Sequence, residues 1–561
     1  MSNKRKTAFI IVAVSVVFLL VYAFVLKKPT NMVFLNIHTA EGQTQVSLIE
    51  QRRDFGGEKE LRGDEYTVTK VNMQQSYGDG KYYLFLPEYL DLSEVQVIYT
   101  SEDGSSPKLM FDGVEVSAQT SVQCELAEGV EHTIQLDDKE LEFLVMKGSA
   151  IPSLWLNTNE SMGYIHENQS HTTGGSVMVL SGTGKPEYSG AMESLKGRGN
   201  SSWYMLKKSY TLKLDAAASL LGMTPGKSWV LLGGALDVTC MRNKIFMDMA
   251  EKSGLQNSME SQWVDLYING EYYGCYLLTE KIAVASGRLE IGDLEEQMEV
   301  LNDQPLENYA PFSIQGDIPM KGYGVANNPD DISGGYLLEV ETYLQRYHEE
   351  PGGFITMNGI PVLVKSPQHV SQAQVQYISS YVQKFEEALY SEDGYNLDGK
   401  YYLDYIDLES FALRYLIDEI SKNIDAGFSS YFFYKPQGDD KMYAGPMWDF
   451  DTTLGNNNNW GDSAVLQDPA GLYMNRANWS EQLWAKPDFR AEVERLYMEE
   501  LLPYMDELVE GGLDEYAATI YDSAKMEGVY MGRPDLDGEI DYVKEFIRER
   551  RDYLEEEFAG E

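Results

Sequence analysis

The alternation of hydrophobic and polar positions is strongest in the first quarter of the chain. From about residue 32 to 156, short apolar runs such as Tyr82–Leu86 and Val95–Tyr99 are separated by turns that carry Gly-Asp-Gly or Glu-Asp-Gly. Many short alternating runs with regular turns are typical of two packed β-sheets. We therefore predict a β-sandwich domain at 32–150.

The pattern changes after Trp155 and again near residue 370. Residues 175–300 still predict strands, with one helix at Val238–Ser253 that has Asp237 at its N-cap and Gly254 just beyond its end. Residues 300–335 are rich in Pro, Gly and Asn and predict a loop-rich insertion. Beyond them, the spacing predicts helices at about 368–391, 406–424, 487–509 and 536–558, with one strand pair at Ser430–Tyr434 and Met442–Trp448.

A strand-rich half followed by a helix-rich half predicts the α+β class. The expected arrangement is a two-lobed domain at 151–561, with an N-lobe at about 151–300 and a C-lobe at about 335–561.

The first 30 residues contain an uncharged run from Thr7 to Leu26 that follows three basic residues, Lys4, Arg5 and Lys6. Its length matches the ~20 apolar residues of a membrane-spanning helix. No small-residue cleavage site follows the run, so we predict a transmembrane signal anchor at 7–26, with a cytoplasmic tail at 1–6. Cleavage after the run is the alternative, and it too would leave the body of the protein outside the cytoplasm.

Composition narrows the classes of partner. The formal net charge is -44 and 43% of the residues are hydrophobic, which indicates a folded, acidic protein. Such a surface repels nucleic acid, so we exclude it as a partner. Three cysteines give no disulfide framework, and the six histidines form no zinc-binding pattern.

One segment reverses this charge. Between Lys196 and Lys244 there are eight basic residues and only two acidic ones. The segment Lys196–Ser202 contains Gly197 and Gly199, whose backbone can approach a ligand closely and offer N–H groups to phosphate oxygens. The pattern indicates an anion-binding site. A tight turn with solvated lysines is the alternative.

Acidic residues form a second candidate site. Asp425 follows the predicted helix at 406–424, and Asp449 and Asp451 follow the predicted strand at Met442–Trp448. Carboxylates at the point where an element enters a loop can bind Mg²⁺ or Mn²⁺. Alternatively, they accept hydrogen bonds only from nearby backbone N–H groups.

The order of these features is that of protein kinases, in which a phosphate-binding loop and a strand lysine precede a catalytic Asp and a metal-binding Asp. The individual segments resemble the spore coat protein H (CotH) kinase family over about 150 to the end of the chain. The segments that carry the resemblance are Leu195–Trp203, Lys207–Tyr210, Asp237 with Met241–Asn243, Leu266–Gly274, Leu278–Lys281, Gly335–Glu339, Asn423–Asp425 and Gly445–Asp451.

The resemblance implies an atypical kinase-like fold that uses ATP and Mg²⁺ or Mn²⁺ to phosphorylate serine or threonine of secreted, spore-coat or cell-envelope proteins. Asp425 would be the catalytic Asp and Asp449 would bind metal, while Asp451 would be either a second metal ligand or a hydrogen-bonding support of Asp449. The residues implied at the nucleotide and its phosphates are Arg198, Asn200, Ser201, Lys208, Lys207, Lys213, Arg242 and Glu280. Strand alternation places Lys207 and Lys213 on one face and Lys208 on the other, and it leaves the choice among the three open.

The sequence departs from ordinary kinases at three places. Asn423-Ile424-Asp425 replaces His-Arg-Asp, and Ser430 stands where kinases have a second metal-binding Asn. Asp449-Phe450-Asp451 replaces Asp-Phe-Gly. Two other functions remain as alternatives. The chain could be a kinase-like surface adhesin or coat-assembly scaffold without activity, or a carbohydrate-active enzyme that uses the acids of Trp448–Asp451.

Overall fold

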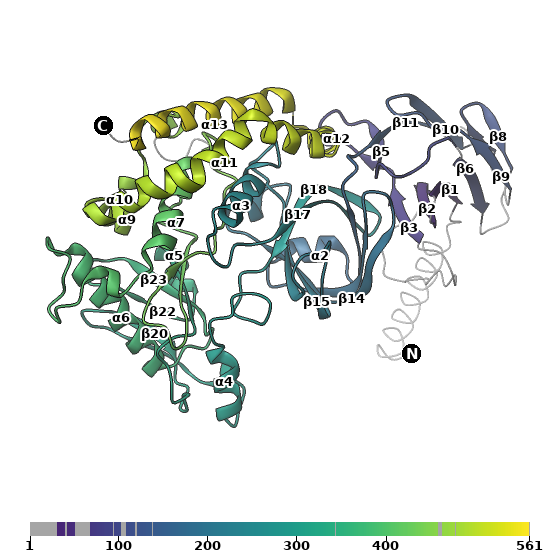
Figure 1. Cartoon of the computed structure of the whole chain (residues 1–561). Helices are drawn as coiled ribbons and strands as arrows, with labels where there is room; N and C mark the ends of the chain where they lie inside the picture. The colour runs from purple at the N-terminus through teal and green to yellow at the C-terminus, as the bar shows by residue number, and fades with distance from the viewer. Residues whose placement is uncertain are drawn as a thin grey trace, which may run out of the picture. The chain divides into compact units, whose positions relative to one another are not determined.

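The computed structural model describes residues 31–39, 42–50, 68–93, 95–101, 108–117, 120–136, 139–342, 344–457, 463–476, 478–533 and 535–559. The predicted tail at 1–6 and anchor at 7–26 lie outside these residues. Within the described ranges, no helix combines the length and the apolar character needed to span a bilayer. These residues form both sheets and helices, which confirms the α+β class (Figure 1).

The described residues fall into two compact units. The first contains the residues up to Lys147 together with Tyr267–Tyr272, and the second contains Gly148–Leu266 and the residues from Tyr273 onward.

The first unit contains two β-sheets. One has the strand order β3-β2-β1-β6-β9 and the other β4-β5-β11-β10-β7-β8. Apolar side chains at alternate positions, such as Val95, Val97 and Tyr99, are buried, as expected for strands that cover a core on one face. The strands are β1 (Asn31–Thr39), β2 (Gly42–Glu50), β3 (Val68–Asn72), β4 (Gln74–Gln75), β5 (Tyr82–Leu86), β6 (Val95–Ser101), β7 (Leu109–Phe111), β8 (Val114–Val116), β9 (Ser121–Cys124), β10 (Glu131–Leu136) and β11 (Lys139–Lys147).

Most of a closed β-barrel, drawn in blue and teal in Figure 1, belongs to the second unit. Its strand order is β12-β13-β14-β15-β16-β18-β17. Trp229, Leu212 and Leu231 are fully buried residues of its strands. The strands are β12 (Ser153–Thr158), β13 (Thr173–Leu180), β14 (Pro186–Arg198), β15 (Ser209–Ala218), β16 (Gly226–Leu232), β17 (Ser261–Ile268) and β18 (Glu271–Glu280).

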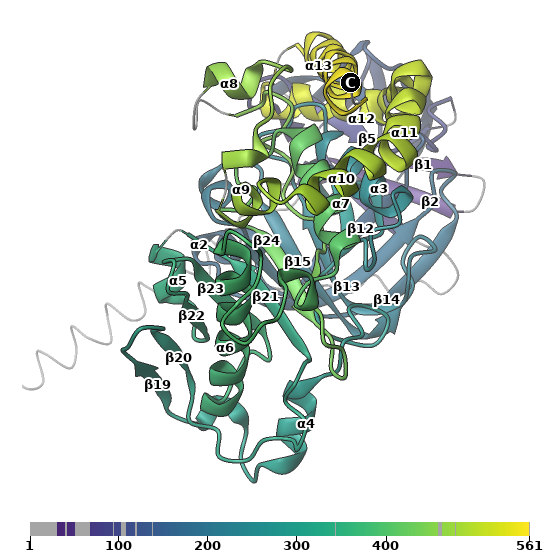
Figure 2. The ribbon, with the colours of Figure 1, turned by 60° about the vertical axis from the view of Figure 1, so that its left-hand side comes forward.

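A seven-stranded sheet follows, with the order β19-β20-β22-β23-β21-β24-β25. Helix α6 lies against β20 and β22 of this sheet (Figure 2). The strands are β19 (Pro311–Ile314), β20 (Met320–Tyr323), β21 (Tyr336–Val340), β22 (Gly353–Ile355), β23 (Pro361–Ser366), β24 (Tyr431–Lys435) and β25 (Tyr443–Ala444).

Helix α7 is the central helix of the second unit, because each residue from Ser410 to Ser421 is buried. It contacts α3, α10 and α13. The helices are α2 (Met162–Glu167), α3 (Arg242–Lys252), α4 (Leu294–Leu301), α5 (Leu344–Glu349), α6 (Gln372–Tyr390), α7 (Leu408–Ser421), α8 (Ser463–Gln467), α9 (Asn478–Trp484), α10 (Pro487–Leu496), α11 (Leu502–Glu507), α12 (Leu513–Met531) and α13 (Leu536–Phe558).

Several predicted boundaries were wrong. Helix α3 begins at Arg242 with Met241 at the N-cap, because Asp237–Cys240 form turns and Cys240 has a φ of 58°. Strand β25 ends at Ala444 rather than Trp448, since Pro446 has no N–H to donate to a sheet. The predicted insertion at 300–335 includes the paired strands β19 and β20.

Candidate active site

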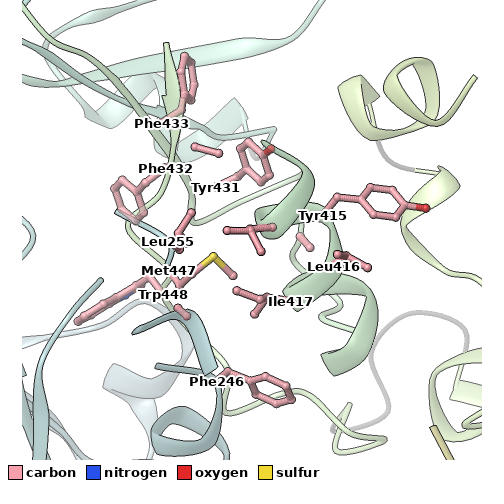
Figure 3. Close-up of a cluster of buried hydrophobic side chains, with 14 of the residues drawn as sticks. Phe246, Leu255, Tyr415, Leu416, Ile417, Tyr431, Phe432, Phe433, Met447 and Trp448 are labelled. Atoms are coloured by element: carbon pink, nitrogen blue, oxygen red, sulfur yellow. The ribbon is translucent and has the colours of Figure 1, made fainter. Parts of the chain in front are cut away.

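The loop after β25 separates its apolar and acidic side chains. Met447, Trp448 and Phe450 are buried, whereas Asp449 and Asp451 are only half-buried. Figure 3 shows Met447 and Trp448 among apolar side chains that include Leu255 and Ile417. Asp449 has a φ of 72°, a left-handed conformation that Asp tolerates better than most residues. Burial of the apolar neighbours therefore fixes the segment that carries the two carboxylates.

Helix α3 holds this loop in place. The side-chain Oδ1 of Asn243 accepts a hydrogen bond from the backbone N of Phe450 at 2.9 Å. The Nε of Arg242 donates to the carbonyl O of Thr453 at 3.1 Å. The Arg242 guanidinium also donates to Asp237 Oδ1 at 2.6 Å, and this pair is buried. Arg242, which was predicted to bind the phosphates, thus stabilises the loop instead. Asn243 is a second positioning residue, and the sequence analysis did not identify it.

Asp425 lies in the turn that follows α7. The helix ends at Lys422, which has a φ of 46° and caps it in the left-handed conformation. Asn423 Oδ1 accepts from the backbone N of Asp425 at 3.1 Å, and the Asp425 carbonyl accepts from the N–H groups of Phe428 and Ser429 at 2.9 Å. The backbone is therefore held on both sides of the predicted catalytic carboxylate.

The structure brings the predicted acidic residues together. Burial, reinforced by the charges of Asp449, Asp237 and Asp425, raises the pKa of Asp451 well above its usual range. Carboxylates in such proximity repel one another unless a proton or a cation joins them. The Ser430 hydroxyl donates to Asp449 Oδ2 at 3.1 Å.

This donor set fits Mg²⁺ or Mn²⁺ in chemistry. Asp449 and Asp451 supply hard carboxylate oxygens, which these ions prefer, and Mg²⁺ usually fills its remaining positions with water and substrate phosphates. Across the described ranges, no group of three His, Cys, Asp or Glu side chains is arranged to hold a metal by itself. Asp449 and Asp451 would supply two of the oxygen ligands of such an ion.

Arg198 at the end of β14 is the predicted cation that comes near these acids. Its guanidinium stacks over Trp448 at 4.9 Å from the ring centroid. Burial lowers its pKa, and the charge of Asp449 opposes this shift. The Arg198 guanidinium forms no hydrogen bond or ion pair with the part of the chain that the structure describes. A desolvated guanidinium without a carboxylate partner is well placed for an anionic ligand.

The three predicted lysines have other partners. The Lys207 ammonium is buried, where it pairs with Glu527 and donates to the Cys275 carbonyl at 2.6 Å. Lys208 donates to the carbonyl oxygens of Trp203 and Met205 at 2.5 and 3.1 Å. Lys213 pairs with Glu193 at 2.5 Å on the surface.

Asn200 and Ser201 lie in the glycine-bearing turn between β14 and β15. Both are exposed, and a short 3₁₀ helix begins at Ser201. Gly199 has a φ of 106°, and a Cβ atom there would lie 2.3 Å from the Ser202 hydroxyl. The close approach within this turn requires glycine, and it leaves the polar side chains of Asn200 and Ser201 on the surface.

A cavity of about 270 Å³ lies beyond β18. Its lining includes Glu280, Arg288, Asn257, Leu289 and Pro446. Burial raises the pKa of Glu280 to about 7, while Arg288, 2.6 Å away, opposes this shift. Pro446 belongs to the same loop as Asp449, so the cavity adjoins the acidic site.

Comparison with protein families supports this region as the functional part of the chain. The family model described as CotH kinase protein matches residues 195–554, which include Arg198, Asp425, Asp449 and Asp451. A search of curated proteins found no match to the chain.

Proposed function

We propose that this chain, which belongs to the CotH kinase family, transfers the γ-phosphoryl group of ATP to a serine or threonine hydroxyl of a secreted, spore-coat or cell-envelope protein. The observation that carries the proposal is the gathering of Asp425, Asp449 and Asp451 near the unpaired guanidinium of Arg198. Phosphoryl transfer requires mainly positioning and neutralisation of charge, and these groups can supply both.

Each acid has a separate proposed part. Asp425 orients the acceptor hydroxyl and accepts its proton as the new oxygen–phosphorus bond forms and the bond to ADP breaks. Asp449 and Asp451 would hold Mg²⁺ or Mn²⁺, which supplies positive charge to the phosphate oxygens when it is bound. Arg198 would bind the same phosphates, and Asn200 and Ser201 would donate hydrogen bonds from the glycine-bearing turn.

The cavity beside Glu280 suits the nucleoside part of ATP. It is lined by apolar residues such as Met259 and Leu289 together with the polar Asn257 and Glu280. Ligand sites commonly combine an apolar lining with a few polar groups that fix orientation. In this proposal the barrel and the helix-rich part serve as the two lobes of an atypical kinase fold, at about 151–300 and 335–561.

The sequence also supports a proposal for the location of the protein. We propose that 7–26 anchors the chain in a membrane with the bulk of the protein outside the cytoplasm, at the cell surface or in the spore envelope. Protease added to intact cells should then digest the body of the protein. Protection of the body until the cells are lysed would contradict this orientation.

Transfer of labelled phosphate tests the proposed activity. The full chain is incubated with labelled ATP, Mg²⁺ or Mn²⁺ and a serine-rich acceptor protein, and both acceptor labelling and self-labelling are measured. Wild type and the Asp440→Asn control, an exposed carboxylate, should transfer label, whereas Asp449→Asn should not. If wild type neither transfers label nor binds ATP, the kinase proposal fails and the scaffold alternative replaces it.

A further inference from the structure

Lys281 is the first residue after β18, and its side chain has no counterion. It lines the cavity that also contains Glu280 and Pro446. Its ammonium group makes no hydrogen bond or ion pair with any residue that the structure describes. The residue as a whole is solvent-exposed, whereas its side chain is partly desolvated where it lines the cavity. By contrast, Lys207, Lys208 and Lys213 all donate to protein oxygens.

The charges that shift the pKa of Lys281 are cationic. Glu260 and Glu280 line the same cavity, but Glu280 pairs with Arg288 and Glu260 accepts from the backbone N of Thr224. Burial lowers the pKa of Lys281, and the charges of Lys196, Arg198, Lys213 and Lys365 lower it further. Of these, Lys213 pairs with Glu193, and Lys365 pairs with Glu339 and Glu350. Lys281 and Arg198 are left without carboxylate partners. In a chain with a net charge of -44, two neighbouring cations without counterions indicate a site that an external anion completes.

The position of Lys281 relates this site to the cavity and to the acids. Pro446 lines the cavity with Lys281, and two residues later Trp448 supports the Arg198 guanidinium at 4.9 Å. Asp449 follows directly. Lys281 therefore lies in the wall of a cavity that also contains a residue of the acidic loop.

We propose that Lys281, together with Arg198, binds the phosphate chain of the nucleotide. In this assignment Lys281 has the phosphate-binding role that the sequence analysis considered for Lys207, Lys208 and Lys213. It rests on the proposed function for the identity of the nucleotide, but the anion site itself does not depend on phosphoryl transfer. Lys281 donates hydrogen bonds to phosphate oxygens and carries no proton to or from the reacting hydroxyl.

Calorimetric titration of the full chain tests this assignment, with ATP, inorganic tripolyphosphate and adenosine as separate ligands in the presence of Mg²⁺. Charge-assisted hydrogen bonds of this kind correspond to roughly 10- to 100-fold in affinity. Lys281→Met should weaken binding of ATP and tripolyphosphate by that factor and leave adenosine binding unchanged. Lys281→Arg should retain most of the affinity, because it retains the charge.

The matched control is Lys227→Met, which removes a surface lysine paired with Glu193 at 2.8 Å. It should bind all three ligands as wild type does. Thermal unfolding of each variant shows whether it is folded. Lys281→Met should have the Tm of wild type, because the Lys281 ammonium forms no interaction within the protein that the substitution could remove.

Two results would overturn the assignment. One is unchanged affinity of Lys281→Met for ATP and tripolyphosphate. The other is an equal loss for adenosine, which would mean that the cavity itself is damaged. If wild type binds tripolyphosphate through Lys281 but does not transfer label from ATP, the anion site stands and the proposed kinase function fails. If transfer occurs and Lys281→Met has the KM of wild type for ATP, the function stands and the assignment fails.

Discussion

The buried ion pair between Lys207 and Glu527 leads to a prediction about stability. Lys207 precedes β15 of the barrel, and Glu527 belongs to α12 near the end of the chain. Their side chains are 0% and 2% exposed. Glu527 Oε2 also accepts from the backbone N of Cys275 at 2.8 Å, and its Oε1 accepts from Arg533 at 3.1 Å. Gly274 leaves room for the pair, since a Cβ there would lie 2.7 Å from Glu527 Oε2.

Replacement of Glu527 by Gln removes the charge while it keeps the shape. Lys207 would remain buried with no anionic partner, and loss of one member of a buried pair costs about 3–5 kcal/mol. Lys207→Met should cost less, because no buried ammonium is left, and the double variant should be more stable than Glu527→Gln alone. The matched control is Glu193→Gln, whose pair with Lys213 is 42% and 40% exposed and should contribute little to stability.

Stability is measured by urea unfolding of the full chain, which is monitored by tryptophan fluorescence. ATP affinity is measured separately without urea, for each variant that is folded under those conditions. Lys207→Met should keep the ATP affinity of wild type within a factor of about three, which is less than the loss of one charged hydrogen bond. The reasoning is refuted if Glu527→Gln unfolds at the urea concentration of wild type. It is also refuted if folded Lys207→Met loses ATP affinity tenfold or more.

Three further predictions concern the site. Asn243→Ala removes the acceptor of the Phe450 N–H. Steady-state kinetics should show a kcat about tenfold lower with little change in KM, and an unchanged kcat would exclude the positioning role. Burial raises the pKa of Glu280 from 4.5 to about 7. The protonated side chain therefore contributes fully to the free energy of unfolding below pH 4.5, and this contribution is lost as pH rises through 7. The Tm of wild type relative to Glu280→Gln should therefore fall over that range, and a flat difference would argue against the shift. Chelation by EDTA should abolish label transfer and added Mg²⁺ or Mn²⁺ should restore it, whereas persistence of transfer would contradict a metal at Asp449 and Asp451.

Much of the secondary structure could be predicted because it depends on local patterns. Helices α6, α7 and α13 lie within or close to the predicted ranges, since their apolar positions recur with helical spacing. The predicted helix at 487–509 is interrupted by a π-helical segment at Tyr497–Leu501. Helix α12 was missed, because Gly511 and Gly512 directly before it are residues that usually mark a turn or the end of a helix.

The candidate site was predictable only where single residues stand at the ends of elements. Asp425, Asp449 and Asp451 could be selected because each follows a helix or a strand. The partners of the lysines could not be found in this way, since Lys207 and Glu527 are 320 residues apart and their pairing depends on the tertiary fold. The same applies to Lys281, whose significance lies in the absence of a carboxylate partner among the described residues.

The most direct test of the central claim separates nucleotide binding from transfer in the Asp425→Asn variant. ATP affinity is measured by calorimetry, and transfer to the acceptor is measured as label per unit time for the same preparation. If Asp425 accepts the hydroxyl proton, the variant should bind ATP as wild type does but transfer label roughly 10²- to 10⁴-fold more slowly. Transfer by Asp425→Asn at the rate of wild type would contradict the account.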